Sequence, residues 1–238
     1  MLPLKDDVPS RTLPSVTVAL IALNAAVFAY QASLAMGPEP DASRAAQAFV
    51  AEFGVIPCRL TGSCPVVHDF PPPAITVFTS MFLHGGLFHI AGNMLYLWIF
   101  GDNVEDSLGH GRFLLFYLLS GVAAAGAQTL IAPASSVPMV GASGAISGVL
   151  GAYLILFPYA RVLVLLIFGF FARLVYVPAV IVLGFWIVVQ FVNGFVTIGA
   201  VAADGAETGG TAWFAHIGGF LAGIVLLFLL RPRRSARL

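Results

Sequence analysis

Ser143 and His216 are the two residues whose types and surroundings best suit catalysis. Ser143 stands between Gly141 and Gly144 at the head of one apolar run, and His216 stands at the head of another. Serine becomes an effective nucleophile when a base accepts its proton, and imidazole suits that task near neutral pH. The surrounding glycines would let two membrane helices approach until the hydroxyl and the imidazole share a hydrogen bond. This pattern predicts Ser143 as a nucleophile and His216 as its base.

A separate polar cluster supplies hydrogen-bond donors that acyl transfer would need for the developing oxyanion. His84, His89 and Asn93 lie in the segment Phe82-Leu-His-Gly-Gly-Leu-Phe-His-Ile-Ala-Gly-Asn93. His89 and Asn93 are four residues apart, so they share one face of a helix. The backbone N–H of Ser143, at a helix start, is a further donor. We therefore expect His89, Asn93 and the Ser143 amide to bind an oxyanion, and His84, one turn further out, to brace the loop by hydrogen bonding.

Three other interpretations of these residues stay open. The serine motif is short enough to be a helix-packing motif whose hydroxyl bonds its own backbone. Polar side chains that face a bundle also line ion paths, but a transporter would need a buried carboxylate or paired broken helices, which the sequence lacks. A zinc site of His84, His89 and His216 would lack a His-Glu-x-x-His helix and would leave Ser143 without a role.

The acidic residues are placed too far from the bilayer to complete a triad. All 11 Asp and Glu residues fall in predicted tails or connections. A hydrolase built on this chain would therefore work with a Ser-His dyad, unlike the three-residue arrangement of many serine proteases. We expect no metal ion and no cofactor at the site.

The composition is that of a membrane protein. Of the 238 residues, 59% are hydrophobic and 9% are charged, whereas water-soluble domains carry about 25% charged residues. The 11 basic residues balance the 11 acidic ones, so the concentrated positive field of a nucleic-acid surface is absent. The bilayer is therefore the expected environment, and nucleic acid is not an expected partner.

Apolar runs of roughly 20 residues predict an all-α polytopic bundle with six transmembrane helices. The predicted spans cover residues 13–34, 77–100, 113–131, 141–157, 175–195 and 213–230. They define a membrane domain at 13–230, with an N-terminal tail at 1–12, a long outer loop at 35–76 and a basic C-terminal tail at 231–238. The apolar stretch 162–171 is too short to span, and we expect it to be an interfacial or re-entrant connection.

The distribution of Lys and Arg predicts that both termini are cytoplasmic. The basic residues on the N-terminal side are Lys5, Arg11, Arg112, Arg161, Arg173, Arg231, Arg233, Arg234 and Arg237, against Arg44 and Arg59 opposite. Spans two, four and six then all enter from the outer face of the cell (plasma or inner) membrane. We therefore expect the five polar residues of the two clusters to meet in the outer half of the bilayer, at a site open to the outer side.

The outer loops carry two further features. Cys58 and Cys64 lie in the loop at 35–76, and an oxidising outer compartment would permit a disulfide between them. The alternatives are two free thiols or a metal site with His68, which offers too few ligands. The loop at 194–211 is rich in Gly and Ala, with Asp204 and Glu207 as its charges, and it suits a mobile lid over the site.

The joint pattern resembles the rhomboid family of intramembrane serine proteases over roughly residues 13–230. Gly141-Ala-Ser-Gly144 is similar to the family's nucleophile motif, Ala215-His216 with Gly218, Gly219 and Gly223 to its last-helix motif, and His84, His89 and Asn93 to its second-helix set. The resemblance implies a Ser143–His216 dyad, oxyanion binding by Asn93, His89 and the Ser143 amide, and a water-filled cavity that opens outward. It also implies single-span membrane proteins as substrates, cut near the outer membrane boundary.

The sequence departs from the family pattern at one position. Several members carry an aromatic residue four positions after the nucleophile, stacked on the histidine, and Ser147 occupies that place. Another ring, Tyr153 or Phe214, would then orient His216. The family's fifth helix is thought to be a side gate, which makes Trp186 and Gln190 candidate gate residues. A catalytically inactive, client-binding relative that acts in membrane-protein quality control is the alternative function.

Overall fold

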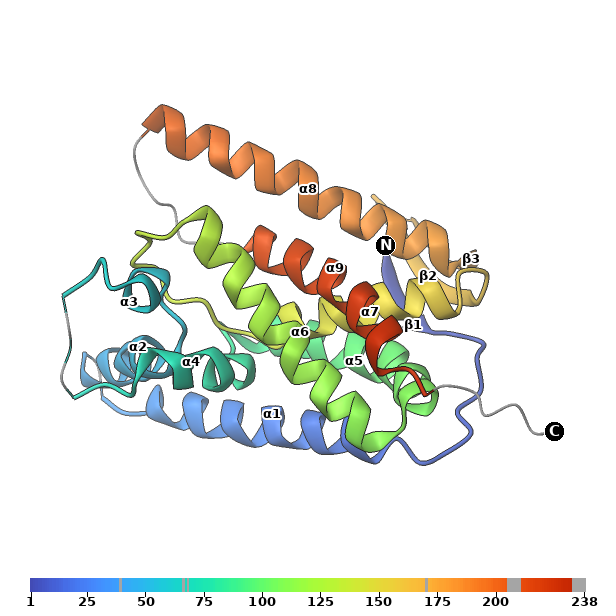
Figure 1. Cartoon of the computed structure of the whole chain (residues 1–238), viewed down its shortest axis with the longest axis horizontal. Coiled ribbons are helices and arrows are strands. Elements are labelled where there is room, and N and C mark those ends of the chain that lie inside the picture. The colour runs from blue at the N-terminus through green and yellow to red at the C-terminus, as the bar shows by residue number, and fades with distance from the viewer. Residues whose placement is uncertain (39, 66, 68, 170, 205–210, 233–238) are drawn as a thin grey trace.

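The chain folds into a bundle of long helices with a small antiparallel sheet at one end (Figure 1). The computed structural model describes residues 1–38, 40–65, 67, 69–169, 171–204 and 211–232. In chain order the elements are β1 (Leu2–Lys5), α1 (Ser15–Leu34), α2 (Asp41–Phe53), α3 (Pro57–Thr61), α4 (Pro73–Thr79), the 3-10 helix η1 (Ser80–Phe82), α5 (Leu87–Leu108), α6 (His110–Ile131), α7 (Ser143–Leu156), β2 (Arg161–Phe168), β3 (Phe171–Pro178), α8 (Ala179–Asp204) and α9 (Trp213–Leu230).

The mostly helical, polytopic membrane architecture is confirmed. Among the described residues, α1, α6, α8 and α9 are each long and apolar enough to cross a bilayer. A further candidate span is bent by 82° where Pro73–Phe82 meets Leu87–Leu108. The fourth predicted span holds α7, an apolar helix of 14 residues. Each predicted span therefore contains a helix, but the second and fourth are not simple straight spans.

The predicted second and fifth spans need correction at their boundaries. The second, 77–100, is interrupted at residues 83–86, where Gly85-Gly86 separates η1 from α5. Helix α5 then continues to Leu108, so it carries Asp102, Glu105 and Asp106, which the sequence pattern had assigned to a connection. The fifth span starts at Ala179 instead of Val175, because the preceding residues belong to β3.

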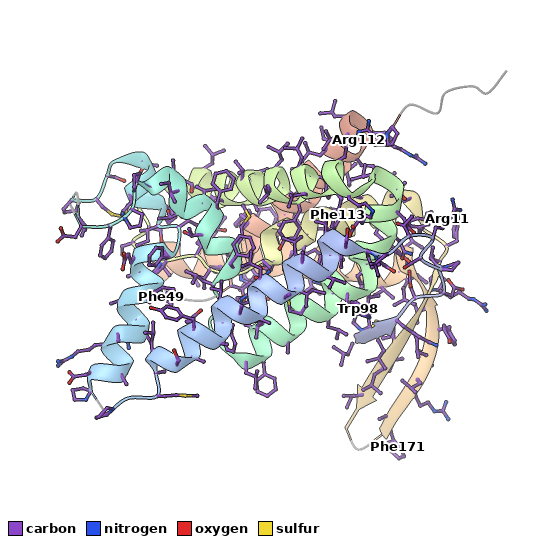
Figure 2. All side chains as sticks on the ribbon, turned by 90° about the horizontal axis from the view of Figure 1, so that it is seen from below. Arg11, Phe49, Trp98, Arg112, Phe113 and Phe171 are labelled. Atoms are coloured by element: carbon purple, nitrogen blue, oxygen red, sulfur yellow. A yellow bond between two sulfur atoms is a disulfide. The ribbon has the colours of Figure 1, made fainter. Side chains whose placement is uncertain are left out.

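The segment between α7 and α8 is a β-hairpin, which the apolar pattern at 162–171 did not predict. β2 pairs with β3 in antiparallel register from Arg161–Pro178 to Phe168–Phe171. Val162 and Val164 are fully buried on one face of the sheet, as the two-residue period of a strand requires. β1 pairs with the other edge of β2, and Figure 2 shows Phe171 at the tip, away from the helices.

Helices α7 and α9 are in backbone contact. This contact brings together the two apolar segments that begin near Ser143 and His216. A Cβ added at Gly219 would lie 2.1 Å from the Gly144 carbonyl oxygen, and one added at Gly223 would lie 2.2 Å from the Gly148 carbonyl oxygen. Since no side chain fits at those distances, glycine at these positions sets the spacing of the two helices. Gly144 itself also packs tightly, against Ala124 of α6.

Hydrogen bonds hold the N-terminal segment against one end of the molecule. This hairpin end comprises the sheet, the start of α1 and the last turn of α5. Asp6 is hydrogen-bonded to the Tyr153 hydroxyl of α7. The Asp7 carboxylate accepts hydrogen bonds from the backbone N–H and Nε of Arg161, and these bonds hold the pKa of Asp7 below its usual value. Residues 1–12 are therefore bonded into the fold.

Glu105 organises the same end from inside the bundle. Its buried carboxylate accepts hydrogen bonds from the backbone N–H groups of Val16 and Thr17 at 2.9 and 2.8 Å, and from the Thr17 hydroxyl at 2.7 Å. A carboxylate at this position satisfies the free N–H groups of the first turn of α1 and complements its dipole. His110 lies against the same carboxylate, with Nδ1 2.5 Å from Oε1.

Candidate active site

Ser143 is the first residue of α7, and its depth follows from the length of that helix. Fourteen residues span only about 21 Å at 1.5 Å per residue, against a hydrocarbon core of about 30 Å. The loop that precedes Ser143 must therefore enter the bilayer. Irregular backbone is tolerated there only where its polar groups are bonded inside the protein. Met139 forms a two-way bridge with Val55, and the Gly141 N–H donates to the Ser80 carbonyl at 2.9 Å.

The structure brings Ser143 and His216 into hydrogen-bond contact. The Ser143 Oγ lies 2.8 Å from His216 Nε2. His216 lies in the first turn of α9, whose free N–H groups are not capped by a residue of their own helix. Instead, Gln128 Oε1 of α6 accepts from the N–H groups of Phe214 and Ala215 at 3.1 and 3.3 Å. Close packing of α7 on α9 and this cap from α6 together fix the imidazole beside the hydroxyl.

The other ring nitrogen of His216 faces Gln190 of α8. His216 Nδ1 lies 2.8 Å from Gln190 Oε1, and Gln190 Nε2 donates to the Trp186 carbonyl at 3.0 Å. The Trp186 ring lies 5.8 Å from the His216 ring, and the Trp213 ring lies edge-on at 6.3 Å. The two residues proposed from the sequence as gate residues are thus packed against His216, and their role in gating stays a prediction.

His89 and Asn93 converge on Gly141, two residues before Ser143. A Cβ added at Gly141 would lie 2.9 Å from His89 Nε2 and 3.6 Å from Asn93 Nδ2. The Gly85 N–H donates to His89 Nδ1 at 3.2 Å, so the ring proton of neutral His89 resides on Nε2. Asn93 Nδ2 is buried and has no hydrogen-bond partner among the described residues. Within the described part of the chain, His89 Nε2 and Asn93 Nδ2 are thus two donors free to donate to a ligand oxygen near Ser143.

His84 lies behind His89 and is fully buried. Its backbone N–H and carbonyl are both bonded to the Gln31 side chain of α1, at 3.1 and 2.6 Å. Its ring contacts Phe28 and His89, and neither ring nitrogen has a partner within the described chain. The main chain of His84 therefore braces the loop against α1.

A cavity of about 970 Å³ joins these groups to the surface. Its lining includes His89, Asn93, Ser143, Trp186 and His216, together with residues of the outer loops. The cavity is lined mostly by apolar residues with a few convergent polar groups, and a cavity of this size has room for water and for an extended peptide segment. Four of the five side chains predicted to meet at one level therefore line one cavity, namely His89, Asn93, Ser143 and His216, whereas the fifth, His84, does not line it.

Neither ring named from the sequence as a substitute for the missing aromatic at 147 contacts His216. The Tyr153 hydroxyl is bonded to Asp6 at the hairpin end, and Phe214 packs edge-on against Phe195. The Ser147 hydroxyl donates to the Ser143 carbonyl at 2.6 Å. Trp186 and Trp213 contact the imidazole instead.

Gln128 and Trp213 are the site residues that the sequence pattern missed. Both lie close to a membrane helix end, where an amide or an indole is common. Gln128 is the only amide in the second half of α6, where Thr129 is the only other polar side chain, and that isolation was an available signal. No sequence signal pointed to Trp213, because its contact with His216 depends on the rotation of α9 about its axis.

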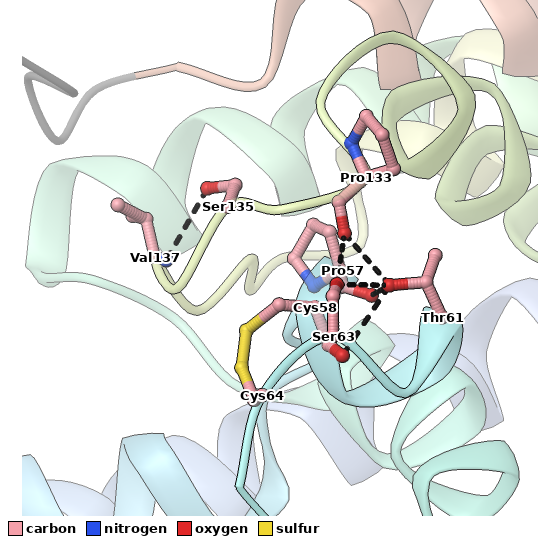
Figure 3. Close-up of a disulfide and its surroundings, with 8 residues drawn as sticks. All are labelled: Pro57, Cys58, Thr61, Ser63, Cys64, Pro133, Ser135 and Val137. Carbon is pink, nitrogen blue, oxygen red and sulfur yellow. Dashed lines mark hydrogen bonds between the residues drawn. A yellow bond between two sulfur atoms is a disulfide. The ribbon is translucent and has the colours of Figure 1, made fainter.

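A disulfide joins Cys58 and Cys64 on the outer-loop side of the site (Figure 3). It closes a turn around α3, whose Thr61 hydroxyl donates to the Pro133 carbonyl at 2.8 Å. Cys58 N–H donates to the Ser135 carbonyl at 2.9 Å. The disulfide-bonded turn is thus anchored to the loop that leads to Ser143.

Several predictions concern residues outside the described part of the chain. They are His68 in the outer loop, Glu207 in the proposed lid, and Arg233, Arg234 and Arg237 in the basic tail. The proposed lid at 194–211 is otherwise shorter than expected, because α8 continues to Asp204.

The fold and site define a class: a polytopic helical membrane protein with a serine–histidine pair on a cavity. A model of the Rhomboid domain matches residues 72–233. The chain therefore belongs to the rhomboid family, and the resemblance drawn from the motifs is confirmed.

Three relatives illustrate the match. The rhomboid protease GluP of Bacillus subtilis is 46% identical over 78 residues, which cover 33% of this chain and 15% of that protein. The mitochondrial Rhomboid protein 1 of Saccharomyces cerevisiae is 36% identical over 99 residues, 40% of this chain and 29% of that protein. The chloroplastic Rhomboid-like protein 11 of Arabidopsis thaliana is 31% identical over 182 residues, 71% of this chain and 56% of that protein. The chain thus covers less than two thirds of each relative.

Proposed function

We propose that this chain is an intramembrane serine endopeptidase that cleaves single-span membrane proteins. The observation that carries the proposal is the 2.8 Å contact between Ser143 Oγ and His216 Nε2 beside a cavity. A serine that merely packs a helix bonds a backbone carbonyl, as Ser147 does. The printed name of the Bacillus subtilis relative, a rhomboid protease, supports the same reaction.

The proposed reaction is acyl transfer in two halves. Ser143 Oγ attacks the scissile carbonyl carbon while its proton passes to His216 Nε2. The carbonyl oxygen becomes an oxyanion and accepts hydrogen bonds from His89 Nε2, Asn93 Nδ2 and the Ser143 N–H. His216 then gives its proton to the leaving amine. Water attacks the acyl-enzyme with His216 as base, which releases the second product and restores Ser143.

The substrate class and the orientation follow from where the site lies. A peptide bond in a transmembrane helix is hydrogen-bonded and shielded, so the substrate must unwind before its carbonyl reaches Ser143. Helix-breaking residues in the target should therefore matter more than a fixed sequence. The distribution of Lys and Arg supports an orientation with both termini on the cytoplasmic side of a plasma or inner membrane. The Cys58–Cys64 disulfide agrees with a site that opens to the oxidising outer side.

Cleavage in proteoliposomes tests the function. The full chain and Ser143→Ala are reconstituted with a model single-span substrate, and the products are measured by gel and mass spectrometry. We expect cleavage by the parent, near its outer membrane boundary, and none by Ser143→Ala. Ser107→Ala is the matched control, because that hydroxyl donates to the Asn103 carbonyl at the hairpin end; it should cleave like the parent. Equal cleavage by Ser143→Ala would refute the proposal.

The same experiment separates the client-binding alternative. A catalytically inactive relative would bind the substrate, so the two would co-purify, and it would leave the substrate intact. Binding without cleavage by the parent, under several lipid compositions, would favour that function over proteolysis.

A further inference from the structure

We infer that Gln190 is a positioning residue that orients His216, so that the site works as a Ser143–His216–Gln190 relay with an amide in place of an acid. This inference rests on the proposed proteolytic function and goes beyond the two-residue dyad. It also gives Gln190 a role different from that of a gate.

The hydrogen bonds determine which nitrogen of His216 carries the proton. Gln190 Nε2 donates to the Trp186 carbonyl at 3.0 Å, so the amide is turned with its oxygen toward His216. An amide oxygen can only accept, and the 2.8 Å contact therefore requires a proton on His216 Nδ1. Neutral His216 is then unprotonated at Nε2, where it can accept the Ser143 proton.

The opposite tautomer would be unproductive. With its proton on Nε2, His216 would donate to Ser143 Oγ and could not act as the base. Gln190 thus accepts the hydrogen bond from His216 Nδ1 and so fixes the tautomer and the orientation of the ring. A buried carboxylate has this role in a Ser-His-Asp triad, and an asparagine has it in papain-like proteases. A neutral amide avoids the cost of burying a charge, since Gln190 is only 4% exposed.

Gln190 can act only through the histidine. Trp186 and His216 line the cavity, but Gln190 does not. No ring comes from α7, because position 147 is serine. The orientation of the imidazole therefore depends on Trp213 of α9 and on Trp186 and Gln190 of α8. The hydrogen bond that His216 Nδ1 donates to Gln190 forms only while α8 is packed on α9.

The oxygen acceptor at position 190 can be tested by three substitutions. Gln190→Leu and Gln190→Met remove the acceptor and keep much of the side-chain volume, whereas Gln190→Glu keeps a carboxyl oxygen in the same place. Asn193→Leu is the matched control: Asn193 Nδ2 donates to the Val189 carbonyl at 2.9 Å, the same bond one turn further along α8, without reaching His216.

Two readouts separate positioning from gating. The first is kcat and KM for a single-span substrate in proteoliposomes, and the second is the rate at which a small fluorophosphonate probe labels Ser143. Loss of one orienting hydrogen bond should lower kcat and the labelling rate by about tenfold each, with KM within about twofold. Gln190→Glu keeps an acceptor oxygen but buries a charge, so it should lose less activity than Gln190→Leu and Gln190→Met, and Asn193→Leu should match the parent.

The outcomes are distinct. If Gln190→Leu and Gln190→Met slow cleavage but label at the parent rate, Gln190 is a gate residue and the inference is wrong. If they cleave and label like the parent, the inference is also wrong while the proposed function stands. If the parent neither labels nor cleaves, the proposed function itself fails, and the inference falls with it.

A spectroscopic measurement avoids dependence on how the variants fold. Parent protein labelled with 15N-histidine, in detergent at neutral pH, gives nitrogen chemical shifts that report the protonation of each ring nitrogen. The His216 signals are assigned by their loss in His216→Asn. We expect a proton on Nδ1 and a bare Nε2, and the reverse assignment would overturn the inference.

Discussion

The two ends of the bundle use polar side chains in opposite ways. Around Ser143 the buried polar groups are imidazoles, amides and a hydroxyl, and they line or back a cavity of about 970 Å³. At the hairpin end most of them are carboxylates, which accept hydrogen bonds from the N-terminal segment or from a helix: Asp6, Asp102, Glu105 and Asp106. The exposed Asp7 accepts hydrogen bonds from Arg161 of β2.

The difference follows from what each end must do. A carboxylate surrounded by donors fixes helix ends and adds stability. A group that moves protons or binds a transient oxyanion must keep a free donor or acceptor, as Asn93 does. Substitutions at the Ser143 end should therefore abolish activity and leave the stability of the fold unchanged. Substitutions at the hairpin end should lower the stability and leave the activity of the folded protein unchanged.

The largest effect is expected at Asn93. Asn93→Ala removes an oxyanion donor, which commonly costs about 10² to 10³ in kcat, while KM and thermal stability should change little. Asn103→Ala is the matched control, because its buried amide donates to the Val8 carbonyl at 3.2 Å at the other end. It should lower stability and keep kcat. Proteoliposome kinetics and thermal unfolding of both variants would test the contrast, and equal kcat for Asn93→Ala and the parent would contradict it.

Glu105→Gln should produce the largest loss of stability. The substitution replaces an acceptor of three donors from Val16 and Thr17 with a neutral amide, and we expect the free energy of unfolding to fall by about 3 kcal/mol. Glu52→Gln, on α2, serves as the control. Unfolding in detergent is the measurement, and the folded fraction should retain the parent's labelling rate at Ser143. A variant as stable as the parent would remove the structural role assigned to Glu105.

The Cys58–Cys64 disulfide should have an intermediate effect. Cys58→Ser with Cys64→Ser frees the turn that is bonded to the loop before Ser143, and we expect the free energy of unfolding to fall by about 2 kcal/mol. Reducing agent should destabilise the parent by a similar amount and leave the double variant unchanged. Identical unfolding of parent and double variant, with or without reductant, would show that the bond does not contribute.

The smallest effect is a pH dependence at Asp6. Burial raises the pKa of its carboxyl from 3.8 to about 6. Because the folded protein then holds this proton more tightly than the unfolded chain, the contribution of Asp6 to stability falls as the pH rises from about 4 to about 6. Asp6→Asn removes that dependence. The melting temperature of the parent relative to that of Asp6→Asn should therefore rise as the pH falls from about 6 to about 4, and a constant difference would contradict the raised pKa.

The sequence predicted the helical architecture and the family because both depend on local patterns. Apolar runs identify membrane helices, and the motifs around Ser143 and His216 are contiguous. It did not predict the pairing of β1 with β2, because β1 lies more than 150 residues before β2, and it did not predict the β2–β3 hairpin, because that segment is a short apolar run. Short apolar runs do not distinguish strand from helix by themselves.

The partners of individual side chains were the least predictable part of the site. The contact of Gln190 with His216 depends on the rotation of α8, and the cap from Gln128 depends on the height of α9 relative to α6. Neither quantity is encoded in a local pattern. The clash that a side chain at Gly141 would make with His89 likewise follows only from the packed loop.

The most direct test of the account is to find which residue a fluorophosphonate probe labels in the membrane-embedded protein, by mass spectrometry of its peptides. The account predicts an adduct on Ser143 in the parent and almost none in His216→Asn, because the imidazole activates the hydroxyl. An adduct on another serine, or equal labelling of Ser143 without His216, would contradict it.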